Sequence, residues 1–342
     1  MKKVILGKTG LEVTKPAMGC LPVQRCGVEE GAALLRAAYE GGIRYFDTAN
    51  AYTDSEMKMG LALADVRDEI VISTKSAAMD KDGVLAHIEN SLHMLKTNHI
   101  DLFQFHQVSA VPDANDPNGA FAGALEAKRR GWIDHIGVTS HRVDVAEQCI
   151  ASGLFETLQF PFSYISSQRD LDLAEKCKEA DMGFIAMKGL AGGMLGSPRA
   201  CHAFMDMYDN VVPIWGIQTM EELREWLALA EEEPAMDEEL AAFIEKERQE
   251  LSGSFCRSCG YCMPCPVGIE IRNCARMDML LRRSPWQPYM SAEWQAKMEK
   301  INDCLGCRQC SSRCPYQLDT PNLLKYMLKD YKEFYEAHKH LL

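Results

Sequence analysis

Short apolar segments alternate with amphipathic stretches through the first two thirds of the chain. Eight apolar segments have the length of a buried strand, and they lie at residues 16–20, 45–49, 70–75, 101–106, 135–140, 157–162, 184–189 and 211–217. Stretches with helical periodicity separate them, as in residues 29–42, 82–96 and 169–182, often with glycine near their ends. This alternation predicts an α/β fold, a parallel (β/α)8 TIM barrel.

The pattern changes on both sides of this region. Residues 3–15 have the pattern of a β-hairpin with Lys8-Thr9-Gly10 at its turn, and we expect the hairpin to close the N-terminal end of the barrel. Residues 227–253 are acidic and helical, and Pro234 interrupts them. We therefore expect a barrel domain over residues 1–233 and a small, mainly helical domain over residues 234–342.

Composition narrows the function classes. With 342 residues, 47% of them hydrophobic, the chain can build a sizeable core in both domains. Acidic residues outnumber Lys and Arg by 49 to 37, which argues against a nucleic-acid partner. No apolar stretch approaches the ~20 residues of a membrane helix, and the N-terminus lacks a signal-peptide pattern. We expect a cytoplasmic protein without a membrane partner.

Two cysteine groups dominate the C-terminal domain. The first is Cys256, Cys259, Cys262 and Cys265, followed by proline; the second is Cys304, Cys307, Cys310 and Cys314, also followed by proline. The second group has the ferredoxin spacing CxxCxxCxxxCP, in which three close thiolates bind one [4Fe-4S] cluster and the fourth binds the other cluster. The first group has two residues, not three, before its last cysteine. The pattern predicts two iron-sulfur clusters.

By resemblance to ferredoxins, each cluster takes one cysteine from the opposite group. The first cluster would use Cys256, Cys259, Cys262 and Cys314, and the second would use Cys304, Cys307, Cys310 and Cys265. Zinc is the alternative, because CxxC pairs also suit a tetrahedral site, although three cysteines at i, i+3 and i+6 fit zinc poorly. We expect the other cysteines to be small buried side chains: Cys20, Cys26, Cys149, Cys177, Cys201 and Cys274.

Four polar residues follow the apolar segments where a barrel builds its chemistry, at the C-terminal strand ends. Asp47, Lys75 and His106 end three successive segments, and Tyr52 lies in the loop after Asp47. A carbonyl that accepts a hydride needs a proton donor, and a phenol with a pKa of ~10 is a weak donor unless a cation lowers that pKa. We expect Lys75 to be this cation and Asp47 to fix its position. His106 would orient the carbonyl or share in the proton relay.

The order and contexts FDTA, AYxxSE, TK and FxFH resemble the aldo-keto reductase family, whose catalytic tetrad is Asp, Tyr, Lys and His. The resemblance covers roughly residues 3–230. It implies an oxidoreductase that binds NAD(P)H in extended form across the barrel mouth, without a glycine-rich phosphate loop. It also implies a small carbonyl or alcohol substrate.

The same resemblance assigns cofactor contacts to this chain. Ser140 and Gln159 would contact the nicotinamide carboxamide, and Phe162 or Tyr164 is a candidate to stack on its ring. The remaining expected contacts are Gly19, Cys20, Asp47, Lys188, Gly189, Leu190, Gly216, Gln218, Thr219, Glu222 and Glu225.

The chain departs from the family pattern at three places. His141 follows Ser140, and Trp226 follows Glu225, where family members usually have asparagine. No Lys or Arg lies between Gly216 and Glu222, where the 2′-phosphate of NADPH is usually bound. NADH therefore fits the sequence at least as well as NADPH.

Two functional hypotheses follow. The leading one is an enzyme that interconverts a carbonyl and an alcohol with NAD(P)H. The other is a noncatalytic electron-transfer or redox-sensing protein that uses the barrel as a scaffold. A hydride carries two electrons and a cluster accepts one, so the clusters would serve an external electron carrier, sense redox state or only stabilise the C-terminal domain.

Overall fold

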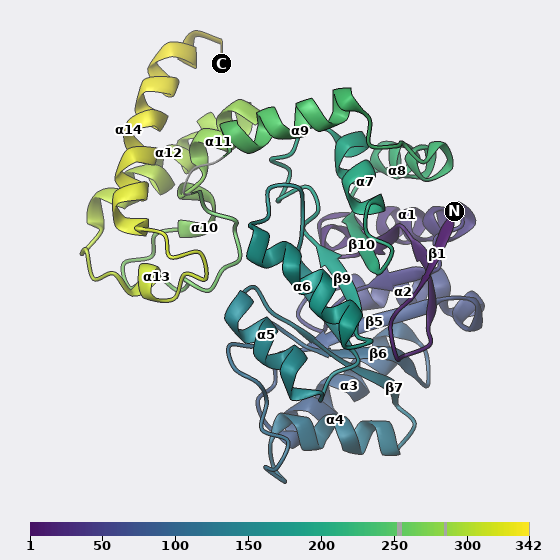
Figure 1. Ribbon diagram of the computed structural model, residues 1–342. Helices are drawn as coiled ribbons and strands as arrows, with labels where there is room; N and C mark the ends of the chain where they lie inside the picture. The colour runs from purple at the N-terminus through teal and green to yellow at the C-terminus, as the bar shows by residue number, and fades with distance from the viewer. Residues whose placement is uncertain (252–254, 284–285, 342) are drawn as a thin grey trace. The chain divides into compact units, whose positions relative to one another are not determined.

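The computed structural model describes residues 1–251, 255–283 and 286–341. These residues form two compact units, shown in Figure 1. The first contains Met1–Gly189 and Pro198–Ala241, and the second contains Leu190–Ser197 and Ala242–Leu342. The chain therefore enters the second unit twice, first with a short segment from the middle of the barrel sequence.

Eight parallel strands close into a barrel in the first unit, which confirms the predicted fold. In chain order the strands are β3 (Ala17–Gly19), β4 (Tyr45–Asp47), β5 (Val71–Ser76), β6 (Ile100–Phe105), β7 (Ile133–Thr139), β8 (Thr157–Pro161), β9 (Gly183–Met187) and β10 (Val211–Gly216). Each strand pairs with the next, and β10 pairs with β3 to close the barrel.

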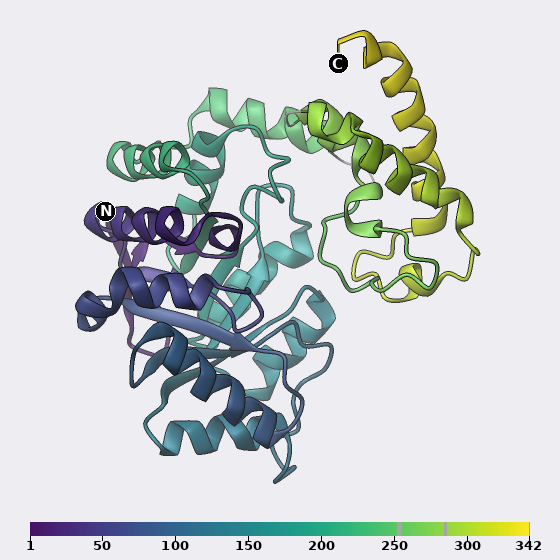
Figure 2. The same ribbon diagram turned by 180° about the vertical axis from the view of Figure 1, so that it is seen from behind.

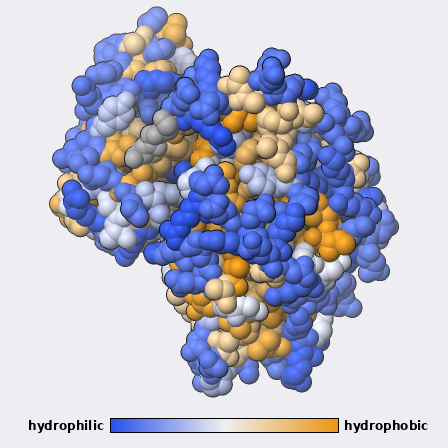
Figure 3. All heavy atoms as spheres, in the orientation of Figure 1, coloured by the Kyte–Doolittle hydropathy of each residue, from blue (hydrophilic) through white to orange (hydrophobic). Residues whose placement is uncertain are grey.

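Helices follow the strands and surround the barrel, as Figure 2 shows from behind. They are α1 (Val28–Glu40), α2 (Ser55–Leu63), α3 (Lys81–Leu95), α4 (Ala120–Arg129), α5 (Val143–Ser152), α6 (Gln168–Glu179), α7 (Pro198–Asp206) and α8 (Met220–Glu232). The helices are amphipathic: α1, for example, buries Leu34, Leu35 and Ala38. The face of the molecule in Figure 3 is accordingly mostly hydrophilic.

The N-terminal hairpin closes the barrel at the N-terminal ends of its strands, as predicted. Strands β1 (Lys2–Ile5) and β2 (Glu12–Lys15) pair antiparallel, and Gly7 forms a bridge with Met182, next to β9. Leu6 is fully buried in a cluster that includes Tyr45 and Ile185. Gly7 has φ +49°, and a Cβ there would lie 2.6 Å from the Asp181 carbonyl oxygen, so the position requires glycine.

The second unit is helical, and its described residues contain no strand. Its helices are α9 (Glu238–Glu250), α10 (Ile271–Cys274), α11 (Met277–Arg283), α12 (Ala292–Glu299), α13 (Gln309–Ser312) and α14 (Thr320–His338). Pro234 lies between α8 and α9, where the sequence predicted an interruption. A separate core forms around Met277, Met298 and Leu324. In the described part of the chain, no helix has the length and apolar character needed to cross a membrane.

Candidate functional site

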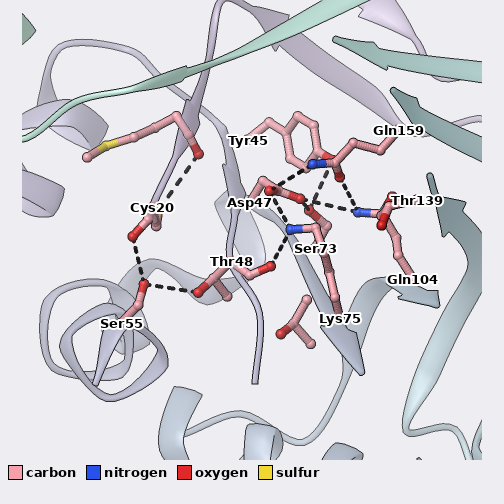
Figure 4. Close-up of polar contacts among 12 residues, drawn as sticks. Cys20, Tyr45, Asp47, Thr48, Ser55, Ser73, Lys75, Gln104, Thr139 and Gln159 are labelled. Carbon is pink, nitrogen blue, oxygen red and sulfur yellow. Dashed lines mark hydrogen bonds and ion pairs between the residues drawn. The ribbon is translucent and has the colours of Figure 1, made fainter. Parts of the chain in front are cut away.

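A buried ion pair lies inside the barrel at the C-terminal ends of its strands. Asp47 ends β4, and Lys75 lies on the neighbouring strand β5. The Lys75 Nζ donates to Asp47 Oδ2 at 2.6 Å and to the Thr48 carbonyl oxygen at 2.5 Å, as Figure 4 shows. Both side chains are almost fully buried, so each charge depends on the other for compensation.

Tyr52 and His106 lie on the solvent side of this ion pair. The Lys75 Nζ is 5.4 Å from the centre of the Tyr52 ring. The rings of Tyr52 and His106 meet edge to face, with 5.8 Å between their centres. Both residues are partly exposed, whereas Asp47 and Lys75 are buried. The structure thus brings the four predicted residues together, with Tyr52 and His106 more exposed than the ion pair.

Electrostatics assign a protonation state to three of these groups. Burial acts to lower the pKa of Lys75, but Asp47, together with smaller contributions from Tyr52 and Cys20, gives a net rise of that pKa. Burial raises the pKa of Tyr52, and the Lys75 cation acts in the opposite direction, as expected, without reversing it. Burial and the Lys75 charge lower the pKa of His106 to about 3. At neutral pH the site holds a charged lysine, a protonated phenol and a neutral imidazole.

His106 is therefore expected to stay neutral between about pH 5 and about pH 9. Its imidazole stays neutral at any pH well above 3, so protonation of this residue cannot produce an acidic limb near its ordinary pKa of about 6.5. The profiles of kcat/KM between about pH 5 and about pH 9 should have the same shape for the wild type and for His106→Gln. A limb near pH 6.5 that disappears in the variant would contradict this assignment.

A hydrogen-bond network behind the ion pair was not predicted from the sequence. Asp47 Oδ1 accepts from Ser73 Oγ at 2.6 Å and from Gln104 Nε2 at 3.2 Å, and the Tyr45 hydroxyl donates to Ser73 Oγ at 3.0 Å. Gln104 Nε2 also donates to Gln159 Oε1 at 2.8 Å. The carboxylate is thus held on both oxygens, which fixes the position of the lysine that it binds.

The sequence did contain a signal for Gln104. It lies two residues before His106, so strand alternation directs both side chains to the inside of the barrel. Gln104 is in register with Lys75 on one side and with Gly137 on the other. A Cβ on Gly137 would lie 3.1 Å from Gln104 Cγ and 2.1 Å from Thr157 Oγ1. Glycine at this position lets Gln104 reach across β7 to Gln159 on β8.

The cysteines of the second unit line two hollows. The first is lined by Cys256, Cys259, Cys262 and Cys314. The second is lined by Cys262, Cys265, Cys304, Cys307 and Cys310. The first hollow thus contains one cysteine from the opposite sequence group, Cys314. The second contains two, Cys265 and Cys262, and Cys262 lies on both walls.

The thiols of the first hollow lie close enough to affect one another. Burial raises the pKa of the Cys262 thiol to about 12, and Cys256 and Cys259 add to this effect. Several cysteines in so small a volume would become thiolates only with a positive centre between them. This chemistry fits a metal or an iron-sulfur cluster and does not fit a plain apolar cavity.

Comparison with known proteins identifies the first unit. Residues 24–200, more than half of the chain, match the family model of the aldo/keto reductases. The chain belongs to the aldo/keto reductase family. It is an oxidoreductase, and residues 255–319 of the same chain match a 4Fe-4S dicluster domain.

Known aldo/keto reductases and related oxidoreductases align with the barrel. The uncharacterized oxidoreductase YrpG of Bacillus subtilis is 30% identical over 231 residues, 57% of this chain and 68% of that protein. The NADPH-dependent codeinone reductase 1-2 of Papaver somniferum is 27% identical over 221 residues, 58% of this chain and 68% of that protein. The crystal structure of an aldo-keto reductase from Klebsiella pneumoniae in complex with NADPH has a TM-score of 0.62 at 20% identity, covering 72% of this chain and 95% of that one.

Several expected cofactor residues of this aldo/keto reductase have partners within the protein. The Ser140 hydroxyl donates to the Val108 carbonyl oxygen at 3.1 Å. Thr219 and Glu222 form the capping box of α8, and Glu222 also accepts from the Gln218 amide at 2.7 Å. These contacts fix the backbone around which a cofactor would bind.

The remaining expected residues occupy the strand ends and loops. Gly19 and Gly216 are in register on neighbouring strands. A Cβ on Gly189 would lie 2.3 Å from the buried Trp215 ring, so this position requires glycine. Cys20 is buried, Lys188 is partly exposed and Glu225 is exposed. Leu190 belongs to the second unit.

Three aromatic residues from the expected cofactor region belong to the core of the aldo/keto reductase barrel. Trp226, which replaces the usual asparagine, is buried and stacks on Trp215 with 3.9 Å between ring centres. Phe162 and Tyr164 are also buried, in an aromatic cluster with Phe204. Phe162 and Tyr164 are therefore core residues of the barrel.

Arg25 supplies a cation that the sequence analysis missed. It lies in a short 3-10 helix (Pro22–Arg25) before α1, and its Nη1 donates to Gln218 Oε1 at 3.4 Å. The two residues are 193 positions apart, so no local pattern connects them. The segment between Gly216 and Glu222 has no Lys or Arg of its own, but Arg25 places a positive charge beside it.

Proposed function

We propose that this aldo/keto reductase interconverts an aldehyde or ketone and an alcohol with NAD(P)H. The arrangement of one phenol, one neutral imidazole and one buried lysine at the barrel mouth supports this proposal most directly. It offers one proton donor, a charge to stabilise the deprotonated donor and a second hydrogen-bonding group. A carbonyl oxygen that gains negative charge during reduction needs these three functions.

Each residue has one role in the proposed reaction. The Tyr52 hydroxyl donates a proton to the carbonyl oxygen, and Lys75 stabilises the phenolate that this leaves. Asp47 keeps Lys75 charged and in place, and Gln104 and Ser73 hold Asp47. His106, neutral because of its burial, donates a hydrogen bond that orients the carbonyl. In the direction of alcohol oxidation the same groups act in reverse.

The nicotinamide cofactor supplies or accepts the hydride when it is bound. Gln159 Oε1 accepts from Gln104, and Gln159 Nε2 donates to Asp47 Oδ2 at 3.5 Å. One of the two N–H groups of the Gln159 amide is therefore left to bind a ligand. That donor suits the carboxamide oxygen of nicotinamide. Lys188, Gly189 and the following loop are the proposed phosphate contacts, and Gly216, Gln218 and their neighbours are the proposed adenosine contacts.

We propose that the second unit binds two [4Fe-4S] clusters. The first would be held by Cys256, Cys259, Cys262 and Cys314. The second would be held by Cys304, Cys307, Cys310 and Cys265. The cysteines that line each hollow support this crossed assignment.

The sequence spacing favours clusters over zinc. Each group has cysteines at i, i+3 and i+6 and a last cysteine followed by proline, a pattern typical of [4Fe-4S] ligands. Three cysteines at i, i+3 and i+6 fit a tetrahedral zinc site poorly.

The two proposed clusters differ in their access to solvent. Cys307 is exposed, and Leu305 beside it is 70% exposed, whereas Cys256 in the first hollow is buried. An external electron carrier would therefore exchange electrons with the cluster held by Cys304, Cys307 and Cys310. This partner would bind the protein at a surface that includes Leu305.

Cofactor titration tests the proposed enzyme directly. Addition of NADH or NADPH to the intact protein should quench tryptophan fluorescence with a Kd between about 1 µM and about 1 mM, the usual range for enzyme ligands. The noncatalytic alternative predicts no binding of either cofactor. No saturable quenching with both cofactors would therefore reject the enzyme.

The same titration defines the role of Arg25. If its guanidinium meets the 2′-phosphate, Arg25→Gln should weaken NADPH binding by about tenfold and leave NADH binding unchanged. Arg129→Gln is the matched control, since Arg129 is exposed on α4 and pairs with Glu126. An equal loss for the two cofactors would contradict a role in phosphate recognition.

A further inference from the structure

The segment Leu190–Ser197 belongs to the second unit although it leaves the barrel directly after Gly189. Its backbone forms a compact turn: the Leu190 carbonyl oxygen accepts from the amides of Gly193 and Met194 at 2.9 and 3.0 Å. Met194 and Leu195 are buried, with 2% and 3% of their surfaces exposed. The turn is thus anchored by two buried side chains, while Gly192, Gly193 and Gly196 are exposed.

Arg283 binds this segment from the end of α11. Its Nη1 donates to the Met194 carbonyl oxygen at 3.0 Å and to Glu247 Oε1 at 2.6 Å. Its Nη2 donates to Glu250 Oε2 at 2.8 Å. Two carboxylates on α9 therefore fix the guanidinium that holds the segment.

Arg276 binds the same segment at Gly192, two residues before Met194. Its Nη1 donates to the Gly192 carbonyl oxygen at 3.5 Å, and its Nη2 donates to Asn273 Oδ1 at 3.3 Å. Gly192 has φ +74°, and a Cβ there would lie 2.9 Å from Arg276 Nη1. The preceding residue, Ala275, lines the first cysteine hollow. The part of the second unit that surrounds the proposed cluster therefore also holds the segment.

We propose that Arg283 and Arg276 are positioning residues for the nicotinamide cofactor. They hold Leu190–Ser197, the segment to which the proposed function gives the cofactor phosphates, in one conformation before the cofactor binds. A segment that is already ordered spares the cofactor the entropy cost of ordering it. The ordered segment thereby contributes to the affinity for NAD(P)H. This inference rests on the proposed function.

Arg283 and Arg276 fix the conformation of the segment and take no part in the chemical step. Tyr52, Lys75 and His106 lie in the first unit and keep their own contacts. Loss of Arg283 should therefore raise the Kd and the KM for the cofactor and leave kcat at saturating cofactor nearly unchanged. A residue that only stabilises the second unit would instead change cluster content.

Neighbouring arginines provide a matched test. Arg283→Gln should weaken NADPH binding about tenfold, with kcat at saturation within about twofold of wild type and cluster absorbance unchanged. Arg282→Gln is the control, because Arg282 pairs with Asp330 on α14. Arg283→Lys, which keeps a charged donor, should recover part of the affinity. Equal Kd values for Arg283→Gln and Arg282→Gln would overturn the proposal.

A variant on the segment itself separates positioning from stability of the second unit. Gly192→Ala places a methyl group against Arg276 without altering any residue that lines the hollows. It should weaken cofactor binding and keep full cluster absorbance. Gly131→Ala controls for backbone strain, since Gly131 has φ +72° with no atom near its Cβ position.

The outcomes separate this inference from the proposed function. If the wild type binds neither NADH nor NADPH, the proposed function fails. If the wild type binds and both Arg283→Gln and Gly192→Ala bind equally well, only the positioning role fails. Loss of clusters together with affinity in both variants would also overturn it, since the residues would then act through the stability of the unit.

Discussion

Replacing Tyr52 with phenylalanine is expected to lower kcat by about 10³-fold while leaving the Kd for NADPH within about twofold of wild type. The variant removes only the hydroxyl. The ring that faces Lys75 and His106 remains, so the packing of the site is preserved. Carbonyl reduction measured by NADPH consumption, together with fluorescence titration of the cofactor, gives both numbers.

The effect is expected to be large because no neighbouring group can replace the Tyr52 hydroxyl as the proton donor. Lys75 is committed to Asp47 and Thr48, and His106 is neutral with a pKa of about 3. Neither residue can readily replace the phenol as the acid. Tyr39→Phe is the control, because the Tyr39 hydroxyl is exposed and bonds to Glu69. A Tyr52→Phe enzyme with wild-type kcat would refute the assignment.

The crossed cysteine assignment predicts a loss of iron that depends on which cysteines are removed together. Two [4Fe-4S] clusters give about eight iron atoms per chain. Cys256→Ala combined with Cys314→Ala removes two ligands of one cluster, so about four iron atoms should remain. Cys256→Ala combined with Cys265→Ala removes a ligand from each cluster, so nearly all iron should be lost. Anaerobic purification followed by iron and sulfide analysis measures both.

The uncrossed alternative reverses these two results. If each sequence group bound its own cluster, the pair Cys256 and Cys265 would leave about four iron atoms, and the pair Cys256 and Cys314 would leave almost none. Cys274→Ala is the control: Cys274 is fully buried, donates to the Lys297 carbonyl oxygen and lines neither hollow. It should keep all its iron. A colourless protein that contains zinc would contradict both assignments.

The barrel could be predicted because its signals are local. Strand ends, helix caps and the alternation of apolar segments depend on residues that are neighbours in sequence. Asp47, Lys75 and His106 each lie within one residue of the C-terminal end of a strand, so the barrel topology alone places them at one mouth. The cysteine spacing is a local signal in the same sense.

Contacts between distant segments could not be predicted in this way. Arg25 meets Gln218, and Gln104 reaches Gln159, only after the barrel closes. The sequence also gave no reason to expect Trp226 to stack on Trp215, because the two residues lie on different elements. Such pairings depend on packing in three dimensions and leave no periodic pattern.

The second unit consists of two separate segments of the sequence, so it cannot be removed or transferred as one continuous piece. A gene that ends after Ala241 would still encode Leu190–Ser197 but would lack both arginines that bind its carbonyl groups. Conversely, grafting residues 242–342 onto another barrel would leave Arg283 and Arg276 without the turn that they hold. No single cut in the sequence therefore separates the two units: a transferable cluster unit must include eight residues taken from the middle of the barrel sequence.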